Sequence, residues 1–407
     1  MKRFVKFFTL IISVIMLLSI TSFGCSKTLS EKDKALSNER RETVVNYMRR
    51  QTDLLWRAGE TFTYTVNHSG KDNDVNIREG ELYLGLPYTY AGGTADAFLE
   101  YSTMGEDDIP VLNGLSSGVL NGGMANSRVG NDCSSAVYLA WSQVSTSIKP
   151  AKDTASMKYM NKNNGFLPLG NYVYDDNNDM NTNQMCSESG AEVIYESYAL
   201  LQKGDVVMRR SSSSGHALMV ADIEVVRDEE GKIDAFASKV VLLEQTFDNL
   251  KSDISYFDEE LNEKVNIICG VDVSYTFMML YNDRYVPITC KELIEPTKEV
   301  KIKTTDSVKK PSLDNLFTGT ISCNYFMDSI YVKIYDVSGN LVQQLVGRMP
   351  RFSQYSYDLS RFVNDEKTGF LGEINIADLP SNTYNVKMDV KLTTGKIITV
   401  RDFTFNK

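Results

Sequence analysis

A change of pattern near residues 296–312 constrains most strongly what this chain can fold into. This segment is rich in lysine and threonine and short of large apolar residues, which is typical of a linker. Residues 76–290 before it mix helical and strand periodicities, whereas residues 313–407 after it carry short alternating runs separated by turn signals. Because 407 residues are enough for two domains, we expect an α+β domain followed by a small all-β domain.

The part after residue 312 contains four predicted strands. They are bounded by turn residues such as Gly339 and Pro380, and they cover residues 329–335, 340–346, 384–392 and 396–405. Strands at this spacing are typical of a β-sandwich, and residues 313–407 have about the size of an immunoglobulin or fibronectin type III domain. Because this part has no histidine and one cysteine, we expect it to be a spacer or to bind a wall component or a protein partner.

The N-terminus predicts export. The first residues are positively charged, and the apolar run over residues 7–20 is too short to span a bilayer, so residues 1–24 are expected to be a signal peptide. Gly24 followed by Cys25 resembles the end of a bacterial lipoprotein signal, in which Cys25 would be lipidated; ordinary secretory cleavage is the alternative. We expect residues 25–40 to be a tether. The protein is then held on the outer face of the cytoplasmic membrane by a lipid anchor, or it is secreted.

The charge balance argues against nucleic acid as a partner. Asp and Glu outnumber Lys and Arg 53 to 43, which gives a net charge of −10, and removal of the three basic residues of the signal peptide takes it to −13. The six cysteines are too scattered for a zinc module and too few for a disulfide-packed scaffold. If Cys25 is lipidated, five cysteines remain, so at least one thiol is free. We expect neither a metal nor another cofactor.

The segment after the tether predicts a long helix. Apolar residues recur at helical spacing from Ser30, which can act as the N-cap, to Trp56. A short strand is expected over residues 61–66, and His68 follows it in a polar turn. Because no cysteine motif lies near His68, we interpret it as a surface residue.

Cys133 stands where a polar turn becomes an apolar helix. Asp132 or Asn131 can cap this helix, and the free amides of its first turn would point at the thiol. The N-terminus of a helix stabilises a thiolate. A free cysteine is often only a small buried residue, but the polar residues on both sides of Cys133 are unlike core packing. Cys133 is therefore a candidate nucleophile.

His216 is the candidate base for this nucleophile. It follows a serine-rich turn and opens the apolar strand 217–221, which places its imidazole at the rim of a sheet. A second strand ends in Glu244 and Gln245, which point to opposite faces, so only one of them can face the imidazole. We favour Glu244, because a carboxylate is rarely buried without a partner, and Gln245 is the alternative. Asp222 and Glu224 are weaker candidates on the strand of His216.

Three blocks of sequence resemble the NlpC-type cell-wall cysteine peptidases, a papain-like family, and the related cysteine- and histidine-dependent amidohydrolases called CHAP domains. The blocks are residues 84–93 (LGLPYTYAGG), 132–134 (DCS) and 201–216, which contains Gly204-Asp205 and ends in Gly215-His216. The resemblance covers roughly residues 80–250. It implies a papain-like catalytic domain, which we place over residues 41–295.

The resemblance also implies a chemistry. Cys133 would be the nucleophile, His216 the general base and Glu244 the residue that orients the imidazole, while the backbone amide of Cys133 would stabilise the oxyanion. Tyr88, Asp132 and Ser134 would line the subsite for the acyl side of the substrate. The implied reaction is hydrolysis of an amide bond in a peptidoglycan stem peptide, without a metal.

Three other functions stay open at this point. One is an N-acetylmuramoyl-L-alanine amidase, another is a cysteine peptidase that acts on proteins, and the third is a catalytically inactive lipoprotein that binds the wall. The sequence departs from the family pattern at Ser135, where a glycine is usual, and in long insertions at residues 94–131 and 150–200. We expect these insertions to form lids or walls of the cleft. The Asn- and Asp-rich run 174–183 is expected to be a solvated loop rather than a calcium site.

Overall fold

The computed structural model divides the chain into two compact units, residues 1–36 and 37–407. It describes residues 31–68, 71–116, 118, 120, 127–144, 148, 154–158, 165–174, 180–252, 254–296, 299–348, 356–361, 370–392 and 396–407. The predicted signal peptide and Cys25 lie outside the described residues. In the part that is described, no helix has the length and apolar character needed to cross a membrane.

The first described element is helix α2, Glu31–Thr52. It begins inside the predicted tether 25–40, and it is shorter at its C-terminal end than the prediction to Trp56. That part of the prediction was wrong because Trp56 belongs to strand β1, Leu55–Ala58. Its indole donates a hydrogen bond of 2.8 Å to the Gly85 carbonyl and stacks on Tyr83, its partner across the sheet. At Trp56 the pairing with a neighbouring strand therefore determines the backbone structure, although the sequence continues the helical periodicity.

A six-stranded mixed sheet follows, in the order β11-β12-β4-β1-β6-β5. Its strands are β1, β4 (Leu82–Leu84), β5 (Thr103–Met104), β6 (Pro110–Leu112), β11 (Ser255–Asp258) and β12 (Glu263–Ile267). Strands β2 (Phe62–His68) and β3 (Lys71–Ile77) form a separate hairpin. His68 is therefore the last residue of β2 rather than a turn residue. Helix α3 (Ala95–Glu100), with β5 and β6, lies within the predicted insertion 94–131, so part of that insertion completes the sheet.

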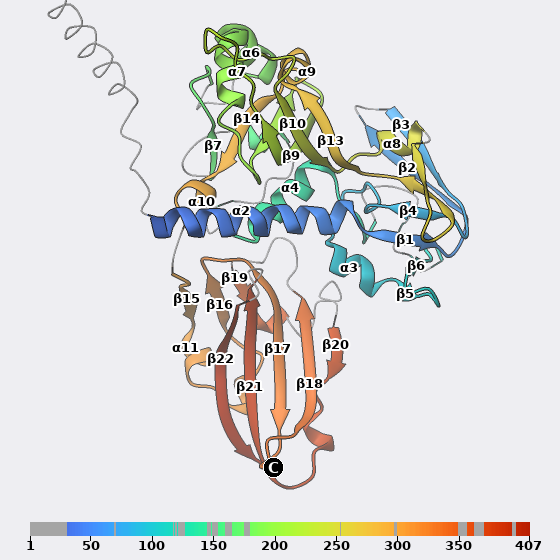
Figure 1. Ribbon diagram of the computed structural model, residues 1–407. Coiled ribbons are helices and arrows are strands. Elements are labelled where there is room, and N and C mark those ends of the chain that lie inside the picture. The colour runs from blue at the N-terminus through green and yellow to red at the C-terminus, as the bar shows by residue number, and fades with distance from the viewer. Residues whose placement is uncertain are drawn as a thin grey trace, which may run out of the picture. The chain divides into compact units, whose positions relative to one another are not determined.

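The second sheet is antiparallel and has the order β13-β10-β9-β8-β14-β7 (Figure 1). Its strands are β7 (Phe166–Pro168), β8 (Val206–Arg210), β9 (Gly215–Glu224), β10 (Lys239–Glu244), β13 (Gly270–Thr276) and β14 (Val286–Cys290). The helices of this region are α4 (Cys133–Ser142), α5 (Thr154–Met157), α6 (Thr182–Ser189), α7 (Ala191–Tyr198), α8 (Asp248–Lys251), α9 (Phe277–Asn282) and α10 (Lys291–Ile294). Strand β7 and helices α5 to α7 come from the predicted insertion 150–200, so this insertion also supplies structural elements.

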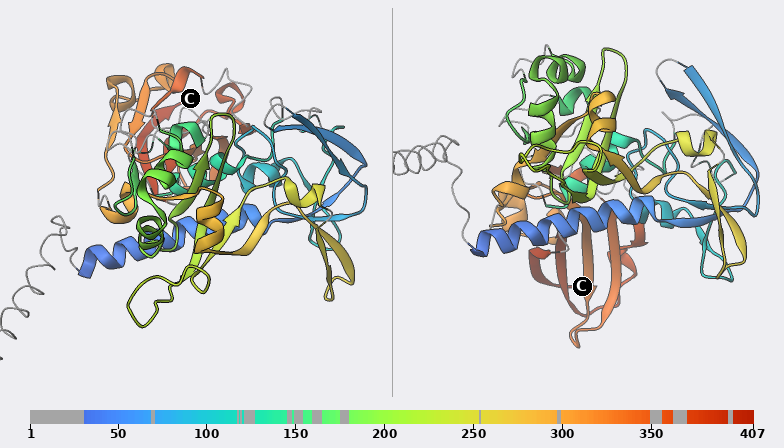
Figure 2. Two further views of the ribbon diagram at one scale, coloured as in Figure 1. Left: turned by 90° about the horizontal axis from the view of Figure 1, so that it is seen from above. Right: turned by 45° about the horizontal axis from the view of Figure 1, so that its top comes forward.

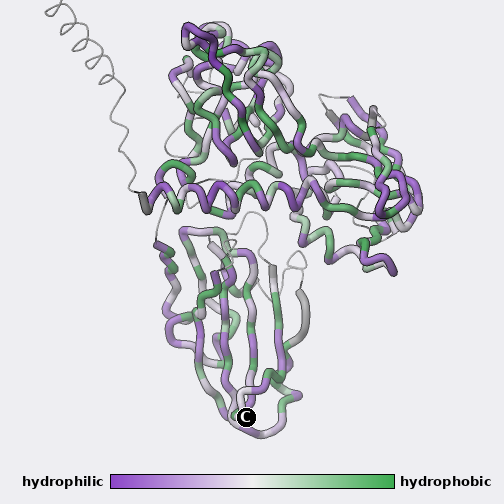
Figure 3. Tube along the Cα trace, viewed as in Figure 1, coloured by the Kyte–Doolittle hydropathy of each residue, from purple (hydrophilic) through white to green (hydrophobic). Residues whose placement is uncertain are grey.

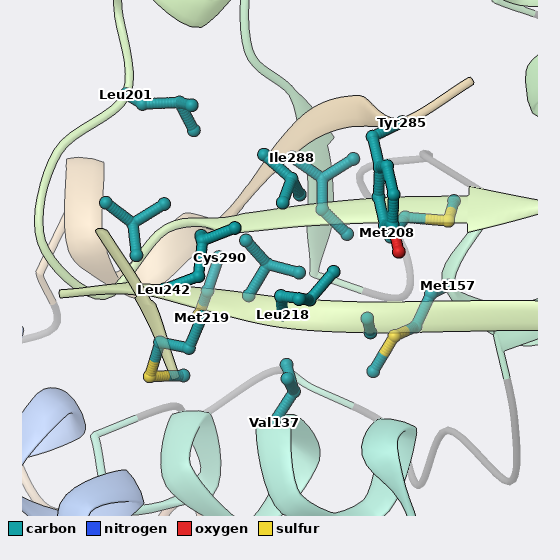
Figure 4. Packing of buried hydrophobic residues seen from close by; sticks show 14 of the residues in the cluster. Val137, Met157, Leu201, Met208, Leu218, Met219, Leu242, Tyr285, Ile288 and Cys290 are labelled. Atoms are coloured by element: carbon teal, nitrogen blue, oxygen red, sulfur yellow. The ribbon is translucent and has the colours of Figure 1, made fainter. Parts of the chain in front are cut away.

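The core of this region lies between the second sheet and the helices packed on it. Every residue of β9 from Ala217 to Ala221 is buried, as expected for a strand covered on both faces. Figure 4 shows Val137 of α4 pointing toward strand β9, which carries Leu218 and Met219. Figure 3 shows hydrophobic stretches along these strands. All ten residues of α4 are buried, so packing on every side fixes the helix that begins at Cys133.

The C-terminal part contains two sheets around one core. The five-stranded sheet has the order β20-β18-β17-β21-β22, with β17 (Met327–Tyr335), β18 (Leu341–Arg348), β20 (Phe370–Glu373), β21 (Thr383–Leu392) and β22 (Ile397–Asn406). The smaller sheet is β15-β16-β19, with β15 (Ile302–Thr304), β16 (Thr320–Cys323) and β19 (Ser356–Asp358). The four strands expected from the sequence are β17, β18, β21 and β22.

The predicted linker 296–312 differs from the structure. It contains β15, which pairs with β16, and helix α11, Asp306–Lys309. Val308 is buried in the core of the C-terminal part, and Ile302 packs against that core. A few apolar residues among many charges are enough to dock this segment, so the all-β part begins before residue 313.

Candidate active site

The local structure around Cys133 starts with the cap of helix α4. Asp132 is the N-cap: its Oδ1 accepts a hydrogen bond of 2.9 Å from the Ser135 amide. Ser134 Oγ donates to the same oxygen at 2.6 Å, and Ser135 Oγ donates to Oδ2 at 2.5 Å. This confirms Asp132 over Asn131 as the cap. Cys133, which is 5% exposed as a residue, lies in the first turn, where backbone amides have no partner within the helix.

The turn before Cys133 is joined to the segment that carries Tyr88. The Asn131 amide donates to the Pro87 carbonyl at 3.1 Å, and Tyr88 and Asn131 form an isolated parallel bridge. Gly130 has φ of +88°, and a Cβ there would collide with the Pro87 carbonyl oxygen. This close approach brings the Tyr88 hydroxyl within 3.8 Å of the Cys133 sulfur.

His216 and Glu244 meet through the register of β9 and β10. Leu243 is paired with Met219, so Glu244 projects to the face of the sheet on which His216 lies diagonally opposite. Glu244 Oε2 lies 3.1 Å from His216 Nε2. The imidazole is 17% exposed and the carboxylate 11% exposed, so the contact is partly shielded from water.

The charges around His216 favour its protonated form. Burial lowers the pKa of this histidine, but the negative charge and hydrogen bonding of Cys133, and then of Glu244, outweigh burial and raise the pKa to about 10. The imidazole therefore holds a proton at neutral pH in its place between Cys133 and Glu244. A nucleophile, a proton carrier and an orienting group in this order form the arrangement used in covalent acyl transfer.

Tyr88 acts on the sulfur as a neutral hydrogen-bond donor. Burial, followed by the negative charges of Cys133 and Asp132, raises the pKa of Tyr88 well above its usual value. The phenol therefore stays protonated, and its hydroxyl donates to the Cys133 sulfur. The sequence predicted Tyr88 as a substrate-binding residue, whereas the structure also places it directly against the candidate nucleophile.

Gln245 follows Glu244 at the end of β10 and points to the opposite face of the sheet, where its contacts differ from those of Glu244. Its Nε2 donates to the Leu86 carbonyl at 2.7 Å and to the Pro87 carbonyl at 3.4 Å, and its Oε1 accepts from the Cys269 thiol at 2.7 Å. Of the two residues considered as the partner of His216, Glu244 is the one in contact with the imidazole. Gln245 instead holds the segment that leads into Tyr88.

The other predicted site residues lie in two places. Asp132 and Ser134 flank Cys133, but both oxygens of Asp132 are engaged by the helix cap, and Ser134 is buried. Their role in substrate binding stays a prediction. Asp222 and Glu224 lie toward the opposite end of the sheet, where Glu224 pairs with Lys239 at the start of β10. They are therefore removed from the imidazole.

Some residues at the site were not predicted from the sequence. Gln51 of α2 is fully buried, accepts a hydrogen bond from Asn131 Nδ2 and donates to the Ala136 carbonyl at 3.4 Å. The Phe247 ring lies 5.5 Å from the Tyr88 ring. A polar residue on the buried stripe of a predicted helix could have drawn attention to Gln51. Phe247 has no comparable signal, because its importance depends on a long-range contact.

The Gly204-Asp205 turn supports the site structurally. Asp205 is fully buried; its Oδ1 accepts from Arg41 Nη1 at 2.9 Å and from Thr289 Oγ1 at 2.6 Å. Burial raises the pKa of Asp205 more than these partners lower it. The Gly204 carbonyl accepts from the Trp141 indole at 2.7 Å. The turn therefore links helices α2 and α4 and the second sheet.

The cysteines of the described part form no disulfide with one another, and all of them are buried. They are Cys133, Cys186, Cys269, Cys290 and Cys323. Burial raises the pKa of Cys186 to about 12, and it also raises the pKa values of Cys269 and Cys323. Within the described ranges, no group of three or more His, Cys, Asp or Glu side chains is placed to hold a metal ion.

Comparison with known proteins gives no assignment. No protein-family model matches the sequence, and no curated protein matches it. The geometry of Cys133, His216 and Glu244 is therefore the principal guide to the chemistry.

Proposed function

We propose that this chain is an exported cysteine hydrolase that cleaves an amide bond in peptidoglycan stem peptides during remodelling of the cell wall. One observation carries the proposal: Cys133 starts a helix beside His216, whose Nε2 lies 3.1 Å from a Glu244 oxygen. The sequence resemblance to NlpC-type peptidases and CHAP domains supports peptidoglycan as the substrate and a papain-like fold for the catalytic part. The N-terminal pattern supports export, with Cys25 as a lipid anchor.

In the first step the Cys133 thiolate attacks the carbonyl carbon of the scissile amide. A carbon–sulfur bond forms, and the π electrons of the carbonyl move to oxygen. The backbone N–H of Cys133 lies in the first turn of α4 and can donate to this oxyanion.

In the second step His216 transfers its proton to the nitrogen of the leaving amine. The carbon–nitrogen bond breaks, the carbonyl re-forms, and a thioester links the acyl group to Cys133. Glu244 holds the imidazole by Nε2 throughout, which keeps the other ring nitrogen, Nδ1, available for the sulfur and the leaving group. Glu244 is thus a positioning residue.

In the third step water hydrolyses the thioester. The now neutral His216 accepts a proton from the water, whose oxygen attacks the acyl carbon. The carbon–sulfur bond breaks, the product leaves as a carboxylic acid, and the thiolate and imidazolium are restored. The Tyr88 hydroxyl, 3.8 Å from the sulfur, stabilises the thiolate at the start and the end of this cycle.

Digestion of purified peptidoglycan tests the proposal. The exported form without residues 1–24 is compared with its Cys133→Ala variant, and new termini are identified by mass spectrometry. Cys323→Ala, which removes another buried thiol, is the matched control. We expect new amino termini within the stem peptide from the unsubstituted protein and the control, and none from Cys133→Ala.

The position of the new terminus separates the enzyme classes. Release of L-alanine amino termini from the muramoyl group would identify an N-acetylmuramoyl-L-alanine amidase. If casein is cleaved in a manner that depends on Cys133 while peptidoglycan stays intact, the protein is a peptidase that acts on proteins. Identical products from the unsubstituted protein and Cys133→Ala in both assays would overturn the enzyme proposal and leave a wall-binding protein.

A further inference from the structure

A polar cavity of about 400 Å³ lies beside the candidate active site. Its floor is formed by neighbouring strands β4 and β12, where Tyr83 is paired with Asn266. Strand β3 of the β2–β3 hairpin and the segment around Phe247 form its walls. Both views in Figure 2 show the β2–β3 hairpin beside the β11–β12 hairpin. The cavity is therefore built from segments far apart in the sequence.

Phe247 connects this cavity to the catalytic centre. It lines the cavity, and its ring lies 5.5 Å from that of Tyr88, whose hydroxyl contacts Cys133. The Phe247 and Tyr88 side chains consequently connect the cavity to the Cys133 sulfur.

The carboxylate of Glu81 is held in place at the cavity wall. Its Oε2 accepts a hydrogen bond from the Tyr83 hydroxyl at 3.1 Å and another from Asn266 Nδ2 at 3.1 Å. Its Oε1 lies 3.6 Å from Arg78. Asn266 is itself fixed, since its amide also donates to the Leu82 carbonyl at 3.1 Å. This network presents a charge whose position is set before a ligand arrives.

The lining carries both signs of charge. Lys264 and Arg78 are cationic, and Asp74 and Glu81 are anionic. Lys264 is exposed, and among the described residues no carboxylate lies within 4.0 Å of its ammonium group. Asp74 accepts a hydrogen bond of 2.9 Å from Thr65 on the neighbouring strand. Such a lining matches a ligand that bears an ammonium group and a carboxylate.

The aromatic residues of the cavity argue against a sugar as the ligand. Sugars commonly stack on an exposed aromatic face. Tyr83 is stacked on Trp56 with ring centroids 4.9 Å apart, and Phe247 is 4% exposed and packed on Tyr88. Neither ring offers a free face of the required size. The charged groups, rather than the rings, are what the cavity presents.

We propose that this cavity binds a zwitterionic part of the substrate peptide, at a place separate from the bond that is cleaved. Lys264 receives the carboxylate of this part, and Glu81 and Asp74 receive its ammonium group. The proposal rests on the proposed hydrolase function, and it names the chemistry by which the substrate is recognised away from Cys133.

Calorimetric titration with a stem-peptide probe tests the proposal. The protein is the exported form with Cys133→Ala, and the probe is synthetic L-alanyl-γ-D-glutamyl-L-lysyl-D-alanine. A fully capped form, with its carboxyl groups amidated and its amines acetylated, is the second probe. We expect Lys264→Ala to weaken binding of the free peptide about tenfold and to leave binding of the capped peptide unchanged. Lys239→Ala removes an exposed lysine from the start of β10 and should leave the affinity for both peptides unchanged.

A second variant tests the opposite charge. Glu81→Gln should weaken binding of the free peptide and have no effect on the capped one. Absence of binding by the free peptide, or an equal effect of Lys264→Ala on both peptides, would overturn the cavity proposal. Failure of the hydrolase proposal is recognised separately, because it appears as unchanged peptidoglycan in the digestion while charge-dependent binding persists.

Discussion

Glu244 Oε2 lies 3.1 Å from His216 Nε2, across two neighbouring antiparallel strands. The contact occupies one ring nitrogen and leaves the other for Cys133. A carboxylate at this place also compensates the positive charge of the imidazolium inside a largely buried site. The proton affinity of His216 is therefore the property that reports most directly on the site.

Proton NMR can measure this affinity with little ambiguity, because the chain has two histidines. We expect the Cε1 proton of His216 to titrate with a midpoint near pH 10. Cys133→Ala should lower the midpoint, because it removes a negative charge while burial of the imidazole remains. Glu244→Gln should lower it as well. His68→Gln identifies the second resonance, and a midpoint near 6.5 for His216 in the unsubstituted protein would contradict the assigned contacts.

The same pKa shift predicts how stability depends on pH. The pKa of His216 is about 10 in the folded state and about 6.5 in the unfolded chain. The resulting stabilisation is fully present below pH 6.5 and is lost as the pH rises through 10. Glu244→Gln should therefore reduce the free energy of unfolding by about 1–3 kcal/mol at pH 6 and by less at pH 10.5. Urea titrations at both pH values measure this, with exposed Asp222→Asn as the control; an equal loss at both pH values would argue against a charged pair.

Alkylation should distinguish Cys133 from the other thiols. Iodoacetamide at pH 7 is expected to modify Cys133 at least about tenfold faster than Cys186, Cys269 or Cys323, whose pKa values are raised by burial. Peptide mapping by mass spectrometry at short reaction times measures the order. Glu244→Gln should slow the modification of Cys133 alone. Earlier labelling of Cys323 in the folded protein would count against an activated nucleophile.

Tyr88→Phe tests the hydrogen bond to the sulfur. The substitution removes the hydroxyl 3.8 Å from Cys133 and keeps the ring that packs on Phe247. We expect kcat/KM for release of peptides from peptidoglycan to fall about 10- to 100-fold, as for loss of a hydrogen bond to a charged group. Tyr90→Phe is the control, since the Tyr90 hydroxyl bonds to the Asn67 carbonyl at 3.2 Å. Equal effects of the two substitutions would remove the case for a role at the sulfur.

Gly130→Ala tests the close approach that brings Tyr88 to Cys133. Gly130 and Gly231 both have positive φ, at +88° and +82°, but only Gly130 has a backbone oxygen where a Cβ would be. Gly231→Ala should reduce the free energy of unfolding by about 1–2 kcal/mol, because of backbone strain alone. Gly130→Ala should cost at least about 1 kcal/mol more and should also slow alkylation of Cys133. Urea unfolding compares the two variants, and similar costs would show that the approach can relax.

The local parts of the site could be predicted from the sequence for physical reasons. A polar turn followed by an apolar helical run fixes where α4 begins, and Asp132 has a side chain suited to capping it. Strand alternation places the side chains of Glu244 and Gln245 on opposite faces of the sheet, so one of the two has to face the imidazole. These features depend on neighbours within a few residues.

The features that were not predicted depend on distant partners. Helix α2 ends before Trp56 because that residue is paired with Tyr83 in a sheet. The expected linker is docked by Ile302 and Val308, two apolar residues in a charged segment. The cavity exists because β12 joins β4, although about 180 residues separate them along the chain. No local pattern contains these pairings.

The length of strand β10 determines which of the two residues at its end, Glu244 or Gln245, faces His216. Insertion or deletion of one residue within β10, before this pair, would exchange the faces of the sheet to which the two side chains point. An amide would then meet the imidazole, and a carboxylate would meet the buried carbonyls of Leu86 and Pro87, which offer it no donor. A surface loop would tolerate such a change of length, but this strand would not. Natural variants of the chain should therefore keep the number of residues in 239–244 constant and differ in length in the turn before this strand.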